Sequence, residues 1–176
     1  MAADERIFVG LGANLGAAAS TLWRAAAELG GLAQTRRIAL SSIYRSAPVD
    51  ATGPDYLNAV AELRSELEPL QLLAALQALE QAHGRTRPFP NAPRTIDLDL
   101  LFYGARMHHD DRLILPHPRL SERAFVLAPL LELAPDGLCA DGRSFAEAFA
   151  SLQDQRLERL RPQRLISRAA STCDSK

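Results

Sequence analysis

Apolar and polar side chains alternate most clearly over residues 96–103, which read Ile-Asp-Leu-Asp-Leu-Leu-Phe-Tyr. This β-branched, leucine-rich and aromatic run, bounded by Pro93 and Gly104, predicts a β-strand. Successive side chains of a strand point to opposite faces, so one face is expected to be entirely apolar. It comprises Ile96, Leu98, Leu100 and Phe102. The other face is charged at its start and apolar at its end, and it comprises Asp97, Asp99, Leu101 and Tyr103.

The hydrophobic pattern of the remaining chain predicts further strands at residues 7–12, 38–44 and 56–67. Helix start and stop signals predict helices at residues 17–29, between Glu68 and Gly84, at residues 125–133, and from Ser144 to about Leu152. In the second of these helices, Gln77 and Glu80 are expected to lie together on one flank of the buried leucine stripe.

Two carboxylates on one face of a strand need a physical reason. At a separation of about 5 Å, Asp97 and Asp99 would repel each other by roughly 3 kcal/mol at an effective dielectric constant near 20. A bound cation would remove this repulsion, and hard divalent cations prefer oxygen ligands. The alternative is that both side chains hang from an exposed strand end without a function. Arg94, just upstream, favours the first interpretation.

A proline-punctuated loop with three arginines precedes this strand, at residues 84–94. A guanidinium group presents a fixed fork of donors that matches phosphate oxygens. Phosphoryl-transfer chemistry requires this combination, in which carboxylates hold a metal and arginines neutralise the remaining charge. His117, fixed between two prolines, is also expected to contact a ligand. The His-His-Asp-Asp run at residues 108–111 is expected to form only a solvated turn.

A flat heterocycle could be held beside the loop at residues 45–55, which is too long for a tight hairpin. On the strand that follows, Tyr56 and Asn58 share the face opposite the apolar one. An aromatic ring next to an amide that both donates and accepts hydrogen bonds suits such a ligand. The alternative is an ordinary strand end.

Composition and charge narrow the function classes. The chain has 176 residues, of which 47% are hydrophobic and 23% charged, as is ordinary for a soluble globular domain. The net charge of −1 gives no basic field to recruit nucleic acid or an anionic membrane. Two cysteines, no signal-peptide pattern and no membrane-length apolar run indicate a cytoplasmic protein. We expect one domain at residues 1–160 and a disordered tail at residues 161–176.

The glycines at positions 10, 12 and 16 suggest a dinucleotide-binding loop, but their spacing is one residue too long for that motif. The acidic strand end that such a site places about 20 residues later is also missing. A tight turn between the first strand and the first helix is the better interpretation.

Several linked motifs occur in order along the chain: FVGLGANLG, SSIYRSAPV, DYLNAV, GRTR followed by PRTIDLDLLFYG, and LPHPRLSERAFVLAPLLELAP. Together they resemble the 6-hydroxymethyl-7,8-dihydropterin pyrophosphokinase family of folate biosynthesis, over roughly residues 6–152. The resemblance implies a single α+β domain with a ferredoxin-like core, in which helices pack on the faces of an antiparallel sheet. It also implies that ATP donates its pyrophosphoryl group to the pterin hydroxymethyl oxygen, with release of AMP. The implied partners are these two small molecules, without nucleic acid or membrane, and the implied state is a monomer.

The same resemblance assigns site residues at matching positions. Asp97 and Asp99 would bind two Mg²⁺ ions that also hold the phosphates of the co-substrate ATP, and Arg85 and Arg94 would steady the transferring group. The nucleotide side would be formed by Gln77, Glu80, Arg87, Arg112, Ile114, His117 and Arg123. The pterin side would be formed by Ser46, Ala47, Val49, Tyr56, Asn58 and Phe125.

The chain departs from the family pattern at positions 46–47, where some members have threonine and proline, and at positions 91–92, where Trp-Gly often precedes Pro-Arg. Phe89 lies two residues before Asn91 and is held between two prolines. We hypothesise that Phe89 replaces the missing aromatic residue and covers the bound heterocycles. The alternative is that Phe89 packs into the core or stays exposed.

Two other function classes are open at this point. An RNA-binding module on such a sheet needs paired aromatic residues on adjacent central strands and a basic face, and the near-neutral charge argues against it. A metal-dependent hydrolase could use Asp97 and Asp99 together with His117. It would yield no pterin pyrophosphate, so analysis of the products separates the two enzymes.

Overall fold

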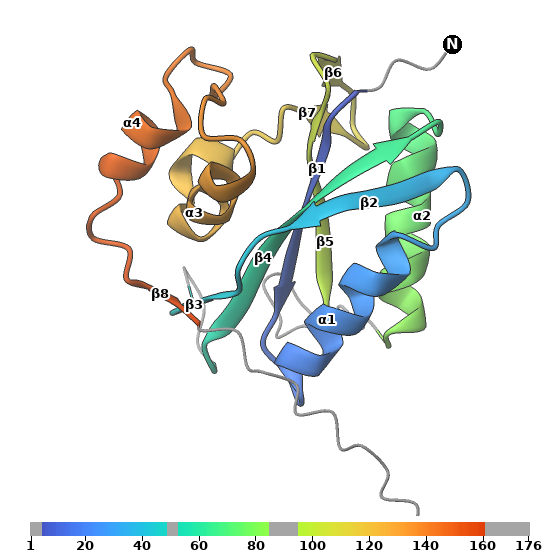
Figure 1. Ribbon diagram of the computed structural model, residues 1–176, viewed down its shortest axis with the longest axis horizontal. Coiled ribbons are helices and arrows are strands. Elements are labelled where there is room, and N and C mark those ends of the chain that lie inside the picture. Colours follow the sequence, from blue (N-terminus) through green and yellow to red (C-terminus); the bar gives the residue numbers. More distant parts are fainter. Residues whose placement is uncertain (1–4, 49–52, 85–94, 161–176) are drawn as a thin grey trace, which may run out of the picture.

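A six-stranded antiparallel sheet forms the centre of the molecule (Figure 1). The computed structural model describes residues 5–48, 53–84 and 95–160. The strand order is β5-β1-β4-β3-β8, and β2 pairs with a different part of β4 from β3. The strands are β1 (Ile7–Ala13), β2 (Thr35–Leu40), β3 (Tyr44–Ser46), β4 (Tyr56–Ser65), β5 (Asp97–Tyr103) and β8 (Leu157–Arg159). A short hairpin pairs β6 (His108–His109) with β7 (Ile114–Leu115).

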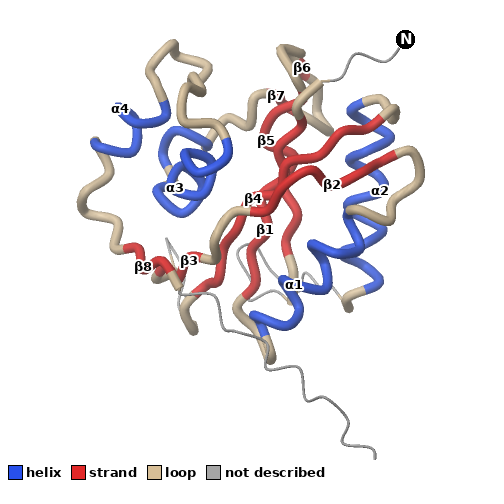
Figure 2. The backbone as a smooth tube through the Cα atoms, viewed as in Figure 1, coloured by secondary structure: helices blue, strands red, loops and turns tan. Residues whose placement is uncertain are grey.

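Helices cover both faces of the sheet, with α1 and α2 on one side and α3 and α4 on the other (Figures 1 and 2). They are α1 (Ala18–Leu29), α2 (Pro69–Ala82), α3 (Ala124–Leu133) and α4 (Phe145–Ala150), with a 3₁₀ turn at Leu120–Glu122. The order β1-α1-β2-β4-α2-β5, with β1 paired between β4 and β5, is that of a ferredoxin-like core. The predicted α+β fold is therefore confirmed. Across the described ranges, no helix has the length and apolar character needed to cross a membrane.

Two separate hydrophobic clusters pack the two faces of the sheet, because neighbouring residues of a strand point to opposite sides. In β1, Ile7 belongs to the cluster under α1 and α2, and the adjacent Phe8 belongs to the cluster under α3. The first cluster includes the fully buried Leu22, Leu29, Leu63, Leu72 and Leu76. The second includes Val60, Leu101, Leu127, Leu130 and Phe145. Each face of the sheet thus has its own core.

The strand predicted at residues 38–44 is wrong in its limits. β2 begins earlier, at Thr35, and ends at Leu40, and the chain resumes as β3 only at Tyr44. A register shift between Arg37 and Ala39 bulges β2 just before this break. The long strand β4 therefore carries two short partners in succession, β2 and then β3.

A bulge also interrupts the alternation predicted for residues 96–103. Consecutive residues of β1 pair with Leu100 and Phe102, so Leu101 is the extra residue of β5. As a result, Leu101 and Phe102 both pack in the cluster under α3, and Tyr103 joins the cluster under α1 and α2. The predicted faces are correct from Ile96 to Leu101 and wrong for the two residues that follow.

The hydrophobic pattern gave no sign of β8, which adds a strand to the free edge of β3. The Leu160 N–H donates to the Ile43 carbonyl at 2.8 Å, and Arg45 forms an ion pair with Glu158 at 3.1 Å. Pairing with a strand more than 100 residues earlier, rather than its own apolar content, places this segment. Residues 161–176 lie outside the described residues, so the predicted domain limit at residue 160 stays a prediction.

We expect truncations on either side of residue 160 to behave differently. A chain that ends at Leu160 keeps every described contact of β8 and should match the full chain in melting temperature and turnover. A chain that ends at Gln155 uncovers the edge of β3 and should melt several degrees lower. Differential scanning calorimetry measures both, and equal melting temperatures would show that β8 adds nothing to the fold.

Candidate active site

Two glycines of β1 leave a stretch of backbone without side chains between polar residues of β4 on one side and of β5 on the other. Gly12 of β1 lies opposite Asn58 of β4 on one side and opposite Asp97 of β5 on the other. Gly10, two residues earlier, lies opposite Asp99. Directly paired residues of adjacent strands project to the same face of a sheet. The two glycines therefore leave a lane without side chains between the aspartates and Asn58.

This glycine lane is the floor of a pocket whose walls come from β3, β4, β5 and the beginning of α3. Of the residues predicted from the sequence, the pocket brings together Ser46, Ala47, Tyr56, Asn58, Asp97, Asp99, Arg123 and Phe125. The remaining lining residues are Gly10, Leu11, Gly12, Ala59, Val60, Leu101, Arg119 and Val126. Positions expected on the pterin side and on the phosphate side thus line one cavity.

Asn58 and Ser46 are buried together at one end of the lane. The Asn58 Nδ2 donates to the Ser46 Oγ at 3.0 Å and reaches the carbonyls of Tyr44 and Tyr56 at 3.5 Å. These hydrogen bonds assign the orientation of the amide. Its Oδ1 lies 3.6 Å from the place that a Cβ would take on Gly12. A hydrogen-bond acceptor therefore faces the lane.

Positive charge approaches the aspartates from the wall formed at the start of α3. The Arg123 Nη1 lies 3.8 Å from the Asp99 Oδ2, and the guanidinium carbon lies 5.7 Å from the centre of the Phe125 ring. Arg119 also lines the pocket. A guanidinium group has five N–H donors, so it can serve a carboxylate and an anionic ligand at the same time.

Glu80 of α2 holds the outer edge of the aspartate strand. Its residue is only 2% exposed, and its Oε1 accepts the backbone N–H of Leu98 at 2.7 Å. Leu98 stands between Asp97 and Asp99 on β5, which is an edge strand of the sheet. The carboxylate thus satisfies a backbone donor that an edge strand would otherwise leave without a ladder partner.

The prediction that Gln77 and Glu80 share one flank of their helix is wrong. Glu80 lies four residues after Leu76 and eight after Leu72, so it continues their buried stripe, whereas Gln77 is exposed. A nucleotide-side role for either residue stays a prediction.

His117 is a neutral ring near the aspartates rather than a wall of the pocket. The Arg119 N–H donates to the His117 Nδ1 at 3.2 Å, which assigns the ring proton to Nε2. Burial is the largest cause that lowers the pKa of His117, from 6.5 to about 4, and the positive charges of Arg123 and Arg119 add to it. The negative charge of Asp97 acts in the opposite direction and is outweighed.

Arg112 and Ile114 lie in and beside the turn of the β6–β7 hairpin, and neither lines the pocket. The Arg112 N–H donates to the Asp110 carboxylate at 2.8 Å, and the His108 ring bonds the same carboxylate at 2.8 Å. Asp110 and Asp111 are exposed between the two strands, but His108 and His109 pair with β7 as strand β6, so the solvated turn expected at residues 108–111 is wrong for the two histidines. The predictions at Arg85, Arg87, Arg94, Val49 and Phe89 fall outside the described residues.

The family model for 7,8-dihydro-6-hydroxymethylpterin-pyrophosphokinase (HPPK) matches residues 8–135, which include every described wall of the pocket. The chain belongs to the HPPK family.

Curated relatives support this membership. The 2-amino-4-hydroxy-6-hydroxymethyldihydropteridine pyrophosphokinase of Pseudomonas aeruginosa is 41% identical over 157 residues, which cover 89% of this chain and 97% of the relative. The protein of the same name from Synechocystis is 47% identical over 128 residues, covering 73% of this chain and 66% of the relative. The one from Haemophilus influenzae is 36% identical over 156 residues, covering 88% and 98%.

Solved structures of HPPK-DHPS chains share the fold. The wild-type Plasmodium falciparum HPPK-DHPS, with SDX-DHP, aligns with a TM-score of 0.68 at 12% identity and covers 84% of this chain. An HPPK-DHPS in complex with substrates aligns with a TM-score of 0.66 at 13% identity. This chain spans only 44% and 43% of those two chains, so it corresponds to less than half of each.

The sequence interpretation missed part of the pocket that HPPK membership makes relevant. The glycine spacing by itself indicates only a tight turn, although Gly10 and Gly12 alternate on a buried strand and so occupy two consecutive positions of one face. Arg119 was passed over, although it lies between His117 and Arg123, both of which were assigned. In both cases the spacing was present in the sequence, and only the sheet register shows what it serves.

We expect side chains at position 12 to block the lane without unfolding the HPPK domain. A Cβ on Gly12 would meet only the Asn58 Oδ1, at 3.6 Å, which is an ordinary contact. Gly12→Ala should therefore raise the pterin KM modestly, and Gly12→Val should raise it by about 10-fold or more, since a bulky β-branched residue still suits a strand. Steady-state kinetics and melting curves test this. A Gly12→Val protein with wild-type kinetics would show that no ligand occupies the lane.

The low pKa of His117 predicts an acid-sensitive fold. Between pH 6.5 and about 4 the unfolded chain binds a proton at His117 that the folded protein does not, so stability should fall as the pH drops through this window. His117→Gln should remove that part of the pH dependence of the melting temperature. Imidazole NMR reads the pKa directly, and a midpoint near 6.5 in the folded protein would contradict the structure.

Proposed function

We propose that this chain transfers the pyrophosphoryl group of ATP to the hydroxymethyl group of 6-hydroxymethyl-7,8-dihydropterin and releases AMP, as its HPPK membership indicates. The observation that carries the proposal is the glycine lane, which separates an amide-and-aromatic end of the pocket from a carboxylate-and-arginine end. A heterocycle and a polyphosphate need opposite surroundings. The lane lets the two reactants meet over the same stretch of backbone.

The pterin would lie at the Asn58 end of the lane. A pterin ring is flat and carries both donors and acceptors at its edge, so it needs aromatic faces and a few oriented polar groups. Tyr56 from β4 and Phe125 from α3 supply the rings. The Asn58 Oδ1 can accept from a ring N–H, and the Ser46 hydroxyl, which already accepts from Asn58, can donate its own proton.

The phosphates of ATP would lie at the aspartate end, with two Mg²⁺ ions as we predict from the family resemblance. Magnesium is commonly bound through one or two carboxylates together with substrate phosphates, and Asp97 and Asp99 form such a donor pair. Among the described residues there is no group of three or more His, Cys, Asp or Glu side chains that could hold a metal alone. The residues thus fit ions that are completed by phosphate and water oxygens. Bound there, Mg²⁺ would neutralise phosphate charge and polarise the transferring group.

The protein's contribution to the reaction is positioning and charge stabilisation. The hydroxymethyl group loses its proton to solvent, and its oxygen forms a bond to the β-phosphorus of ATP while the bond from that phosphorus to the AMP oxygen breaks, with the two oxygens roughly in line. Arg123 and Arg119 can stabilise charge on the phosphates. We propose the same for Arg85 and Arg94, with Arg87 on the nucleotide side. We assign no general base. That the enzyme is monomeric and cytoplasmic and has no nucleic-acid partner stays a prediction.

The direct test is to mix the protein with ATP, Mg²⁺ and 6-hydroxymethyl-7,8-dihydropterin and to follow AMP and pterin pyrophosphate by chromatography. We expect AMP to appear only when the pterin is present, and chelation of the metal to stop its release. Formation of ADP, or phosphate release that does not depend on the pterin, would overturn the proposed reaction. The second outcome would favour a metal-dependent hydrolase.

Neutral variants of the aspartates test the metal end of the site. Asp97→Asn and Asp99→Asn should each lower turnover by about 10³-fold or more. Each substitution removes an anionic ligand of the proposed Mg²⁺ ions, and the phosphate oxygens cannot take its place. The fold should survive, since the substitution also relieves repulsion between the two carboxylates. Turnover and melting temperature are measured together. A large loss of stability with full activity per folded molecule would mean that the aspartates are structural.

A further inference from the structure

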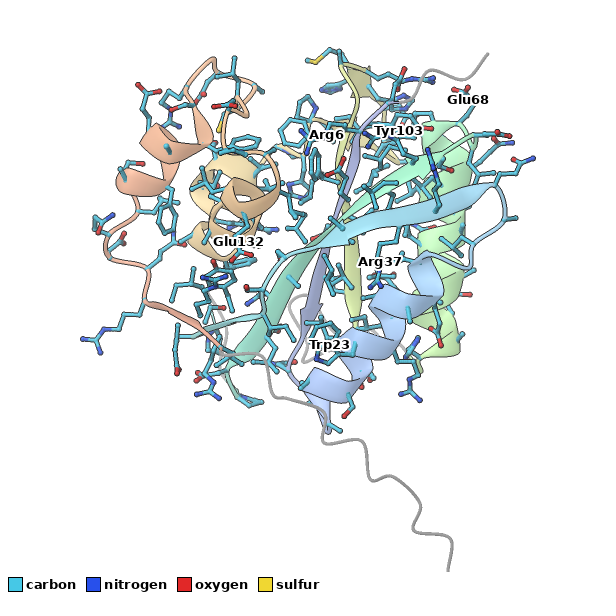
Figure 3. The ribbon with its side chains drawn as sticks, viewed as in Figure 1. Arg6, Trp23, Arg37, Glu68, Tyr103 and Glu132 are labelled. Atoms are coloured by element: carbon cyan, nitrogen blue, oxygen red, sulfur yellow. The ribbon has the colours of Figure 1, made fainter. Side chains whose placement is uncertain are left out.

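One carboxylate ties together three elements behind the pterin end of the pocket. The Glu132 Oε2 accepts the backbone N–H of Ser42 at 2.8 Å, and its Oε1 accepts the Tyr44 hydroxyl at 2.5 Å. The Arg159 Nε lies 3.2 Å from the same Oε1 and donates to the Ser42 Oγ at 3.0 Å. Glu132 belongs to the last turn of α3, Tyr44 begins β3 and Arg159 ends β8. Figure 3 shows Glu132 at the end of α3 that faces the β2–β3 segment.

A carboxylate meets the hydrogen-bonding demand at this point, and its isosteric amide does not. The Ser42 N–H lies in the break between β2 and β3, and the Tyr44 residue is only 9% exposed, so the Tyr44 hydroxyl above all needs an acceptor within the protein. An ionised carboxylate has two acceptor oxygens and can take all three donors. A glutamine would offer one oxygen and would turn its NH₂ group toward a donor.

The elements that Glu132 joins also form two opposing walls of the pocket. β3 ends at Ser46, which lines the pocket with Ala47, and α3 begins with Phe125 and Val126 at the pocket. By standard strand and helix rises, Tyr44 lies about 7 Å from Ser46, and Glu132 about 10 Å from Phe125. Neither Glu132 nor Tyr44 lines the pocket, so the carboxylate acts on it only through the elements that it joins. It is close enough to fix the separation of β3 and α3.

We propose that Glu132 is a positioning residue that sets the width of the slot for the pterin by holding α3 against β3 through Ser42 and Tyr44. This inference rests on the proposed function, since it assumes that the pterin lies between these walls. A substitution that shortens, lengthens or weakens the hydrogen bonds from Ser42 and Tyr44 to Glu132 should change the affinity for the pterin. Asp97 and Asp99, the proposed phosphate-side carboxylates, lie on β5, which these contacts do not touch, and Arg123 at the start of α3 is the phosphate-side residue that would move with α3, so the KM for ATP should change less than the KM for the pterin.

The chain offers a matched control for a charge-neutralising variant. Arg45 and Glu158 form an ion pair at 3.1 Å between β3 and β8, and both side chains are largely exposed. Glu158→Gln therefore removes a carboxylate that bridges the same two strands without reaching α3. Such exposed pairs contribute little to stability. Comparison of Glu132→Gln with Glu158→Gln isolates the contact to α3.

The experiment measures the pterin Kd from the fluorescence of the pterin itself, in the presence of Mg²⁺ and a non-hydrolysable ATP analogue, together with both KM values. We expect Glu132→Gln to weaken pterin binding by about 10-fold, to leave the KM for ATP within about 2-fold, and to reduce kcat less than it raises the pterin KM. Glu158→Gln should match the wild type in all three. Tyr44→Phe removes one donor and keeps the carboxylate, so we expect a smaller shift in the same direction.

Each outcome decides the proposal. If Glu132→Gln raises the KM values for ATP and pterin equally, or changes only the melting temperature, Glu132 is a structural residue and the proposal fails. If that variant does not fold, Tyr44→Phe carries the test, and an unchanged pterin Kd overturns the proposal. If the wild type binds no pterin, the proposed function itself fails, and the inference fails with it. Pterin binding that is intact in the wild type and unchanged in both variants rejects only the role of Glu132.

Discussion

The site depends on one constraint, which is that β1 carries no side chain where it passes between the aspartates and Asn58. Gly12 keeps the lane open, while a Cβ on Gly10 would meet the side chain of Leu101 at 3.5 Å. Leu101 is the extra residue of the β5 bulge, and its side chain lies beside Gly10 in the lining of the pocket. A central strand with ordinary side chains would fill this space and separate the reactants. Two glycines in a buried strand lower the stability of the fold through lost packing and backbone entropy. In return, the pocket has a floor without side chains.

The rest of the architecture places charge and apolar surface around that floor. α1 and α2 pack a continuous core under one face of the sheet, and on the other face the cluster under α3 adjoins the pocket through Val60, Leu101 and Val126. From the side of α1 and α2, Glu80 reaches the edge of β5 and holds the Leu98 N–H between the two aspartates. Glu80 thus fixes the backbone between the two aspartates, and Arg123 lies 3.8 Å from the Asp99 carboxylate. Like charges can stay adjacent only if their backbone is held in this way and cations are supplied from the pocket side.

The features that depend on local periodicity, such as which residues share a face of a strand, could be predicted from the sequence. The features that depend on the pairing register of the strands could not. Alternation correctly placed Asp97 with Asp99 and Tyr56 with Asn58, since each pair needs only a regular strand between its members. It failed beyond Leu101, where a bulge that no side-chain pattern announces reverses the faces. β8 was missed because its stability comes from pairing with β3, far away in the sequence. The burial of Glu80 could have been read from its spacing to Leu72 and Leu76, but a glutamate is not expected on a buried stripe.

A preformed floor also explains why the chemistry needs few titratable groups. His117 resembles a general base, but a pKa lowered to about 4 makes it a weak one, and the Arg119 N–H occupies its Nδ1. The ring then presents its Nε2–H as a donor, and Nδ1 would have to release the Arg119 N–H before it took up a proton. Transfer of a pyrophosphoryl group between two oxygens gains more from alignment and from charge already in place than from a base. We propose that in this protein the alignment comes from the register of three adjacent strands, β4, β1 and β5, which places Asn58, Gly12 and Asp97 side by side.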